Sequence, residues 1–163
     1  MELREEYDIN SRVYKREVFD NTDGAILSEY ILETETKENW RTLLSAITLK
    51  DTENVTLFEA VSDFAKVALT PKETPPSLTS FADQDGNPRI YLLILMIINP
   101  EDGSTEFTYQ VWDKSDIDNL VSFSQFSIKM ERGEEISTVL AKYNNDWVSG
   151  LLQVLRVMIP NGF

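Results

Sequence analysis

The most constraining feature of the sequence is an uninterrupted run of nine apolar residues at positions 90–98. The run is too short to span a bilayer as a helix, which requires about 20 such residues. Its isoleucine content and the Asn-Pro pair that follows favour a strand over a short core helix. We therefore expect a strand buried on both faces and reject the alternative, a membrane-insertion segment.

The next segment, residues 105–112, alternates between apolar and polar side chains. This period of two is typical of a strand with one wet face. The intervening Glu-Asp-Gly-Ser turn contains Gly103, which tolerates positive φ. The two runs together predict a central antiparallel hairpin, with Trp112 on the more polar side and therefore exposed.

Periodicity and turn signals predict the remaining elements. In the segment after residue 39, Trp40, Leu43, Leu44 and Ile47 recur at helical spacing, with Thr36 as a candidate cap. Beyond the central hairpin, we expect strands at 13–19, 25–32, 77–82 and 120–130, the last with a bulge near 124. We expect helices at 40–47, 53–69, 134–143 and 147–159, the last capped by Asp146.

The order of these elements lacks a regular βαβ alternation, which argues against a doubly wound parallel sheet. We expect an α+β fold in which an antiparallel sheet of about five to six strands packs against helices. Residues 1–163 form one domain, the default for this length. Residues 1–12 are charged and without period, and are expected to be a flexible arm or a short helix.

Cysteine and histidine are both absent, which excludes thiol nucleophiles, zinc–thiolate sites and a Ser-His-Asp triad. No glycine-rich phosphate loop occurs. The segment from Asp83 to Asn87 resembles the start of a calcium loop, but Pro88 and Ile94 stand where Gly and Glu are required. We interpret it as a hairpin turn with Gly86 at positive φ. No catalytic residue, metal or cofactor is therefore predicted, and no familiar enzyme class is expected.

The formal net charge is −13, which repels nucleic acid and anionic membranes at long range. Such a surface favours a basic protein partner, or it serves only to keep the chain soluble. A cluster of four carboxylates is the candidate contact, together with Trp112, since tryptophan is enriched at binding hot spots. The cluster consists of Glu29, Glu33, Glu35 and Glu38, for which a simple solvated face is the alternative.

The segment from Ile26 to Trp40 resembles a signature of small uncharacterised bacterial proteins that are often exported. In that signature a strand ending in Glu-Tyr, here Glu29-Tyr30, precedes an acidic turn and Glu-Asn-Trp, here residues 38–40. The resemblance implies no activity. By analogy of element order alone, the fold is similar to the MOG1/PsbP-like arrangement, an antiparallel sheet flanked by helices that often serves binding.

These observations favour a non-catalytic acidic protein-binding module of an accessory, chaperone-like or immunity type. The alternative is a small-ligand carrier or carboxylate-dependent enzyme with a cavity between sheet and helices. Self-association through the apolar C-terminal helix is a further possibility. The first residues have no apolar core and no cleavage site, so cytoplasmic location is expected, or export if a leader was replaced by Met1.

Overall fold

The fold is that of a computed structural model, which describes residues 4–68, 75–99 and 101–158. Parts of three predicted elements lie outside these residues: the start of the arm and the ends of two helices at 69 and 159. In chain order the elements are β1 (Glu6–Ile9), β2 (Arg12–Asn21), β3 (Ala25–Leu32), β4 (Thr42–Leu49), α1 (Leu57–Ala68), β5 (Ser77–Ala82), β6 (Pro88–Ile98), β7 (Thr105–Lys114), β8 (Val121–Met130) and α2 (Ile136–Met158).

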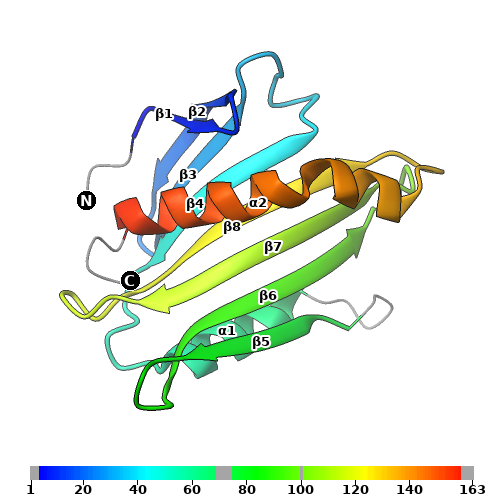
Figure 1. The fold of residues 1–163 in the computed structure, drawn as a ribbon. Helices are drawn as coiled ribbons and strands as arrows, with labels where there is room; N and C mark the ends of the chain where they lie inside the picture. Colours follow the sequence, from blue (N-terminus) through cyan, green and yellow to red (C-terminus); the bar gives the residue numbers. More distant parts are fainter. Residues whose placement is uncertain (1–3, 69–74, 100, 159–163) are drawn as a thin grey trace.

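The strands form one antiparallel sheet of eight, in the order β1-β2-β3-β4-β8-β7-β6-β5 (Figure 1). This confirms the α+β class and the antiparallel sheet, whereas the expected number of five to six strands was wrong. Each set of four strands is a run of consecutive hairpins, and the two sets meet where β4 pairs with β8. These two strands therefore lie at the centre of the sheet.

The two helices lie on opposite faces of the sheet, as Figure 1 shows. On the α2 face, the helix packs over a core that includes Tyr30, Leu44 and Phe126, all 0 % exposed. On the α1 face, a second core gathers around Leu93 and Trp112, also 0 % exposed. Side chains of one strand alternate between these two cores because successive residues point to opposite faces.

The predicted hairpin of β6 and β7 is confirmed, with Leu92 opposite Val111 and Ile94 opposite Tyr109. The expectation that β6 is buried on both faces holds for one face only. Tyr91, Leu93 and Leu95 are buried beneath α1, while the alternate residues on the α2 face remain half-exposed. The strand is second from the sheet edge, not central.

The helix predicted at residues 40–47 was wrong, because this segment is strand β4. Leu44 faces the α2 core, and Leu43 and Ile47 face the opposite side. A central strand covered on both faces has no period of two, so its apolar residues matched the helical template by coincidence. Thr36 is not a helix cap but forms an isolated bridge with Asn39 in the loop before β4.

The described part of the N-terminal segment contains β1 instead of a flexible arm or helix. Tyr7 and Ile9 are 1 % and 0 % exposed and belong to the α2 core. The strand was missed because only four residues carry the alternation. The bulge expected in β8 is also absent, since its register with β7 runs without a shift. In the described part of the sheet, the register shifts instead in β2 at Glu17 and in β6 at Arg89.

The last helix was predicted to break at residues 144–146, but α2 is continuous from Ile136 to Met158. Asp146 is not a cap. It is 6 % exposed and binds the β1–β2 turn, with its carboxylate 2.6 Å from Arg12 Nη1 and 2.9 Å from Asn10 Nδ2. The polar triplet is tolerated in the helix because Asp146 has these charged and polar partners.

Gly150 sets how closely α2 approaches the sheet. A Cβ there would lie 3.3 Å from Leu44 Cδ1 and 3.6 Å from Phe126 Cδ2. We predict that Gly150→Val lowers the free energy of unfolding by about 2 kcal/mol, because the added methyl groups would force the packed layers apart. Urea denaturation measures the change. The control is Asn145→Val on the exposed side of α2, and an equal loss in both variants would contradict a packing limit at Gly150.

Candidate functional site

A groove lies on the α2 face, where the helix does not cover the whole sheet. In Figure 1, α2 crosses in front of the central strands and leaves β5 and β6 without a helix on this side. The hollow has a volume of about 350 Å³ and lies between α2 and strands β5, β6 and β7. Its lining is entirely apolar and consists of Phe81, Ile90, Leu92, Val111, Trp147, Val148, Leu151 and Leu152.

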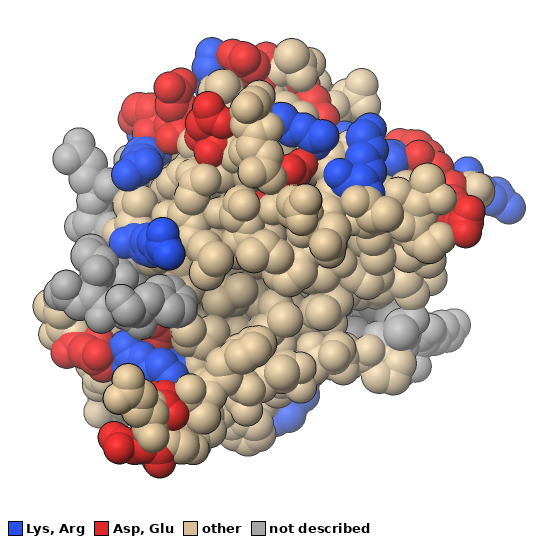
Figure 2. Space-filling view, in the orientation of Figure 1, with Lys and Arg blue, Asp and Glu red and all other residues tan. Residues whose placement is uncertain are grey.

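On the helix side, the wall of this groove includes a stacked aromatic pair and a buried leucine. The Trp147 ring stacks on Tyr109 with ring centroids 4.4 Å apart and an angle of 4° between the planes. Leu151 is 1 % exposed, so it is fixed in the core, whereas Leu152 at the rim is 37 % exposed. Figure 2 shows uncharged side chains across the middle of this face, with Lys, Arg, Asp and Glu toward its periphery. The groove is therefore suited to apolar matter and offers no group for acid–base chemistry.

The opposite, α1 face carries a row of buried polar side chains between β7 and β8. Gln110 and Thr108 are 1 % and 2 % exposed, and Ser127 is 0 % exposed. They form one hydrogen-bonded chain that ends on the carboxylate of Glu106. Trp112 Nε1 donates to Gln110 Oε1 (3.0 Å), and Gln110 Nε2 donates to Gln125 Oε1 (2.7 Å). Gln125 Nε2 then donates to Ser127 Oγ (3.1 Å). The Ser127 and Thr108 hydroxyls are 2.9 Å apart, and Thr108 Oγ1 donates to Glu106 Oε1 (3.2 Å).

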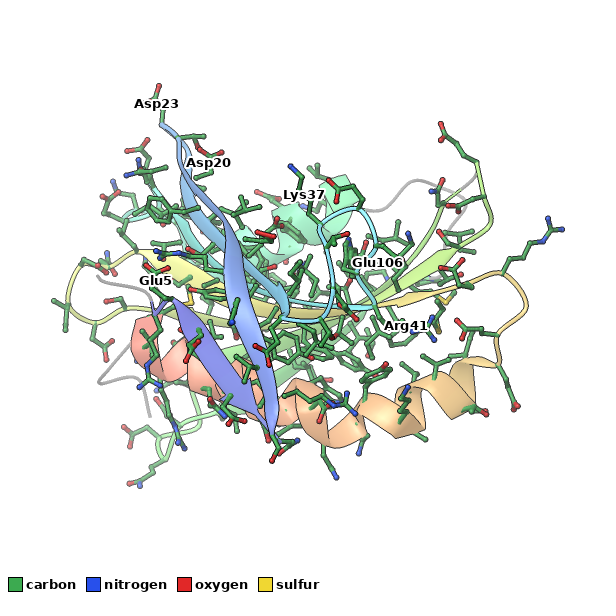
Figure 3. The ribbon with its side chains drawn as sticks, turned by 90° about the horizontal axis from the view of Figure 1, so that it is seen from above. Glu5, Asp20, Asp23, Lys37, Arg41 and Glu106 are labelled. Atoms are coloured by element: carbon green, nitrogen blue, oxygen red, sulfur yellow. The ribbon has the colours of Figure 1, made fainter. Side chains whose placement is uncertain are left out.

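The loop between β3 and β4 lies on this same α1 face, as Figure 3 shows with Lys37 labelled on the loop. Trp40, near the end of the loop, lines two hollows. The Glu106 hollow, about 230 Å³, is lined by Trp40, Ile97, Asn99, Ser104, Glu106 and Lys129. The Glu29 hollow, about 250 Å³, is lined by Glu17, Val18, Glu29, Ile31, Lys37, Trp40 and Leu43.

The four carboxylates predicted as one cluster occupy different environments. Glu29 is half-buried on β3, where burial and the neighbouring charge of Glu106 raise its pKa. Glu33 forms an ion pair with Lys15 at 3.1 Å, and Glu35 accepts a hydrogen bond from the Arg41 amide at 3.0 Å. Glu38 is exposed in the loop. The structure thus directs Glu29 alone toward the polar row.

Trp112 was expected to be exposed, and this was wrong. Its side chain is 0 % exposed and stacks on Phe123 at 3.9 Å between ring centroids, with Phe64 of α1 at 5.2 Å. It does share a face with Thr108 and Gln110, as predicted. That face was taken for solvent-exposed because it is polar, but α1 covers one end of it and its polar groups bond to each other.

The groove residues were not singled out from the sequence, although one signal pointed to them. An apolar run without alternation requires cover on both faces, and β6 has a helix on only one.

The calcium-like segment is confirmed as a hairpin turn. Asp83 Oδ1 accepts the amides of Asp85 and Asn87, each at 2.9 Å, and Gly86 has φ of +84°.

Comparisons with known proteins add no further assignment. No protein-family model, curated protein or solved structure matches this chain at a significant level. Within the described residues, no group of three or more acidic side chains is arranged to hold a metal ion, and no helix is long and apolar enough to cross a membrane. The geometry of the chain itself must therefore carry the functional inference.

Asp113, two residues beyond Val111 of the groove, is a buried carboxylate with incomplete pairing. Its side chain is 0 % exposed, Arg89 Nε lies 3.6 Å from Oδ1, and Oδ2 has no hydrogen bond. Burial raises its pKa to about 6, partly opposed by the Lys114 amide and Arg89. Ionising Asp113 above pH 6 therefore costs the folded state free energy.

We predict that Asp113→Asn weakens the pH dependence of stability. As pH falls from 7.5 to 5, the wild type takes up a proton at Asp113 in the folded state and should gain about 1 kcal/mol relative to the variant. Urea unfolding at both pH values measures this difference. The control is Asp102→Asn in the β6–β7 turn. Hydrogen bonding from Ser104 lowers the pKa of this exposed carboxylate, so it stays ionised over this interval and its removal should leave the pH slope unchanged. Identical pH slopes for wild type and Asp113→Asn would refute the assignment.

Proposed function

We propose that the protein is a non-catalytic binding module that holds a small apolar ligand in the groove between α2 and strands β5, β6 and β7. The observation that carries the proposal is a hollow of about 350 Å³ with eight lining residues that are all apolar. Ligand sites are typically concave and mostly apolar, with volumes of roughly 300–1,000 Å³. The groove lies at the small end of that range, which favours a single chain or ring over a cofactor-sized molecule.

Two features support a carrier over the carboxylate-dependent enzyme considered from the sequence. None of the lining residues is Asp or Glu, so the groove supplies no acid, base or nucleophile to a bound molecule. The absence of histidine and cysteine removes the usual residues for such roles throughout the chain. The Trp147–Tyr109 stack is suited to binding because the Trp147 ring is already packed against Tyr109, so ordering it against a ligand costs little further side-chain freedom.

We predict that Leu152→Glu reduces the affinity for apolar ligands at least 10-fold. The side chain lies at the groove rim, so a carboxylate there would have to be desolvated by any apolar ligand, while its 37 % exposure lets the variant fold. The neutral dye Nile red serves as the probe, and its displacement by decanol reports competition for the same surface.

The matched control is Val67→Glu on α1, an exposed apolar residue on the other face of the sheet. It should leave Nile red binding within 2-fold of wild type. The proposal fails if the wild type does not bind the dye, or if both variants lose it equally. Light scattering accompanies the assay, since a dimer formed through the exposed Val148 and Leu152 of α2 would occupy the groove and overturn a ligand role.

An acidic protein-binding module, the first expectation from the sequence, is the second candidate. The favouring observation is the charge balance, since the chain contains 28 acidic and 15 basic residues and has a formal net charge of −13. The excess is available to a basic partner. Pull-down from the native host at low and high salt tests it, and a partner retained only at low salt is the expected result.

A further inference from the structure

Strand β5 is one edge of the sheet, and among the described elements no strand lies beyond it (Figure 1). Natural proteins protect such edges with charged residues, very short strands or a covering segment, because the unpaired backbone groups otherwise pair with another chain. All six residues from Ser77 to Ala82 are exposed, and none is charged. Leu78 and Phe81 add apolar side chains that are 39 % and 52 % exposed. This edge is therefore open to a further strand.

The opposite edge of the sheet, β1, is protected. That strand has only four residues, and Glu6 and Asp8 place charges along it. The backbone carbonyl of Asp8 also accepts a hydrogen bond from Gln153 Nε2 of α2 at 3.0 Å. The same chain thus closes one edge with charge and a helix contact. The absence of both devices from β5 favours a role for its edge in binding.

The backbone groups of β5 that face outward follow from the register. The Asn99 amide donates a hydrogen bond across the β6–β7 turn at 2.8 Å, so the backbone of Asn99 faces β7. Because the direction of the N–H and C=O groups alternates along a strand, the backbone of Leu92 faces its β5 partner, Thr79. Thr79 is therefore bonded to β6, and the N–H and C=O groups of Leu78 and Ser80 point away from the sheet.

The apolar groove lies directly beside this edge. Phe81 of β5 is one of its lining residues, so the groove begins at the edge strand. Thr79 and Phe81 are opposite Leu92 and Ile90, which line the groove, so these β5 residues lie on the α2 face. Recognition by strand addition combines main-chain hydrogen bonds with pockets for alternate side chains. Here the edge supplies the hydrogen bonds and the groove supplies the pocket.

We propose that β5 binds an extended, uncharged segment of a partner protein. The segment pairs antiparallel with the backbone of Leu78 and Ser80 and points an apolar side chain into the groove. The groove contact rests on the proposed function, since this side chain would be the apolar ligand, whereas the strand pairing does not depend on it. Antiparallel pairing is slightly the more stable arrangement, and it is the one found throughout this sheet.

A second copy of the chain fits this edge less well than a partner segment. Two chains with a net charge of −13 repel each other, whereas an uncharged segment meets no such barrier. Pairing of two six-residue strands alone also falls short of the roughly 1,000 Å² that a stable interface buries. A peptide gains the groove contact in addition to the edge.

The test uses the full chain and a short acetylated peptide of alternating leucine and threonine, followed through the amide NMR shifts of β5. Peptide residues opposite Leu78 and Ser80 lie on the α1 face and turn their N–H groups toward β5. With the leucines on the groove side, these residues are the threonines. N-methylation of the threonine amides should weaken binding at least 10-fold, while N-methylation of the leucine amides should leave it within 2-fold. The proposal is overturned if the parent peptide does not bind, if both methylated peptides behave alike, or if only leucine methylation weakens binding.

Ser80→Pro is the matching variant of the protein. Its N–H points outward, a position where an edge strand tolerates proline, and its side chain lies on the α1 face, away from the groove. It should weaken peptide binding at least 10-fold and leave Nile red binding within 2-fold, which also reports that the variant is folded. Leu152→Glu should weaken the binding of both. Unchanged peptide affinity in a folded Ser80→Pro variant would rule out strand pairing.

The two proposals fail in different ways. Nile red binding without peptide binding overturns the partner strand and leaves the apolar ligand site standing. Peptide binding that survives Leu152→Glu removes the groove from the interaction and overturns the placement of the apolar side chain. Sedimentation of the chain alone tests the remaining occupant. A wild-type dimer that dissociates in Ser80→Pro would identify a second copy at the edge and overturn the proposal of a partner segment.

Discussion

The sheet is wider than its helices can cover, and the rest of the structure follows from that mismatch. Eight strands at about 4.8 Å spacing span roughly 34 Å, whereas a helix with its side chains is about 10 Å across. Each face carries one helix among the described elements. Part of each face therefore has to be covered by loops, by its own polar network or by another molecule. The groove and the Trp40 hollows lie at those uncovered parts.

The two uncovered parts differ in chemistry because the strands that form them differ. β6 carries apolar residues on both sides. On the face that carries α2, its residues Ile90 and Leu92 lie beside the helix without being covered by it, and they form the floor of the apolar groove. On the α1 face, β7 and β8 instead place Gln110, Gln125 and Ser127 beyond the helix. These side chains satisfy each other, which keeps a polar surface stable without a helix above it.

The sequence predicted best where the local pattern and the tertiary cover agree. β7 alternates because its faces differ, and α1 has a clear apolar stripe because only one side of it meets the sheet, so both were found. β4 was predicted as a helix because it lies in the middle of the sheet with a core on each face. Both of its faces therefore carry apolar residues, and the alternation that marks a strand is lost. In the middle of α2, the buried Asp146 is paired with Arg12, 134 residues earlier in the chain, and no local signal in the sequence reports such a partner.

The candidate sites were less predictable than the fold, for a physical reason. Trp112 and Glu29 were both selected from the sequence, but their exposure depends on where α1 and the β3–β4 loop pack. The face on which a residue lies can be read from the strand period, whereas the cover over that face is a property of distant segments. The groove residues come from β5, β6, β7 and α2, so no single stretch of sequence contains the site.

Two small residues at the contact between α2 and the centre of the sheet, one on each side, determine how deep the groove is. Ser124 on β8 donates a hydrogen bond to the Leu151 carbonyl at 3.1 Å, and Gly150 lets the same turn of α2 rest on the layer below. Leu151 and Leu152, which form the helix side of the groove, are in the adjoining positions. The close approach of α2 to β8 therefore fixes the height of the groove wall above β6 and β7. The apolar groove is a consequence of how tightly the centre of the molecule packs, and it would change shape with any substitution that lifts α2.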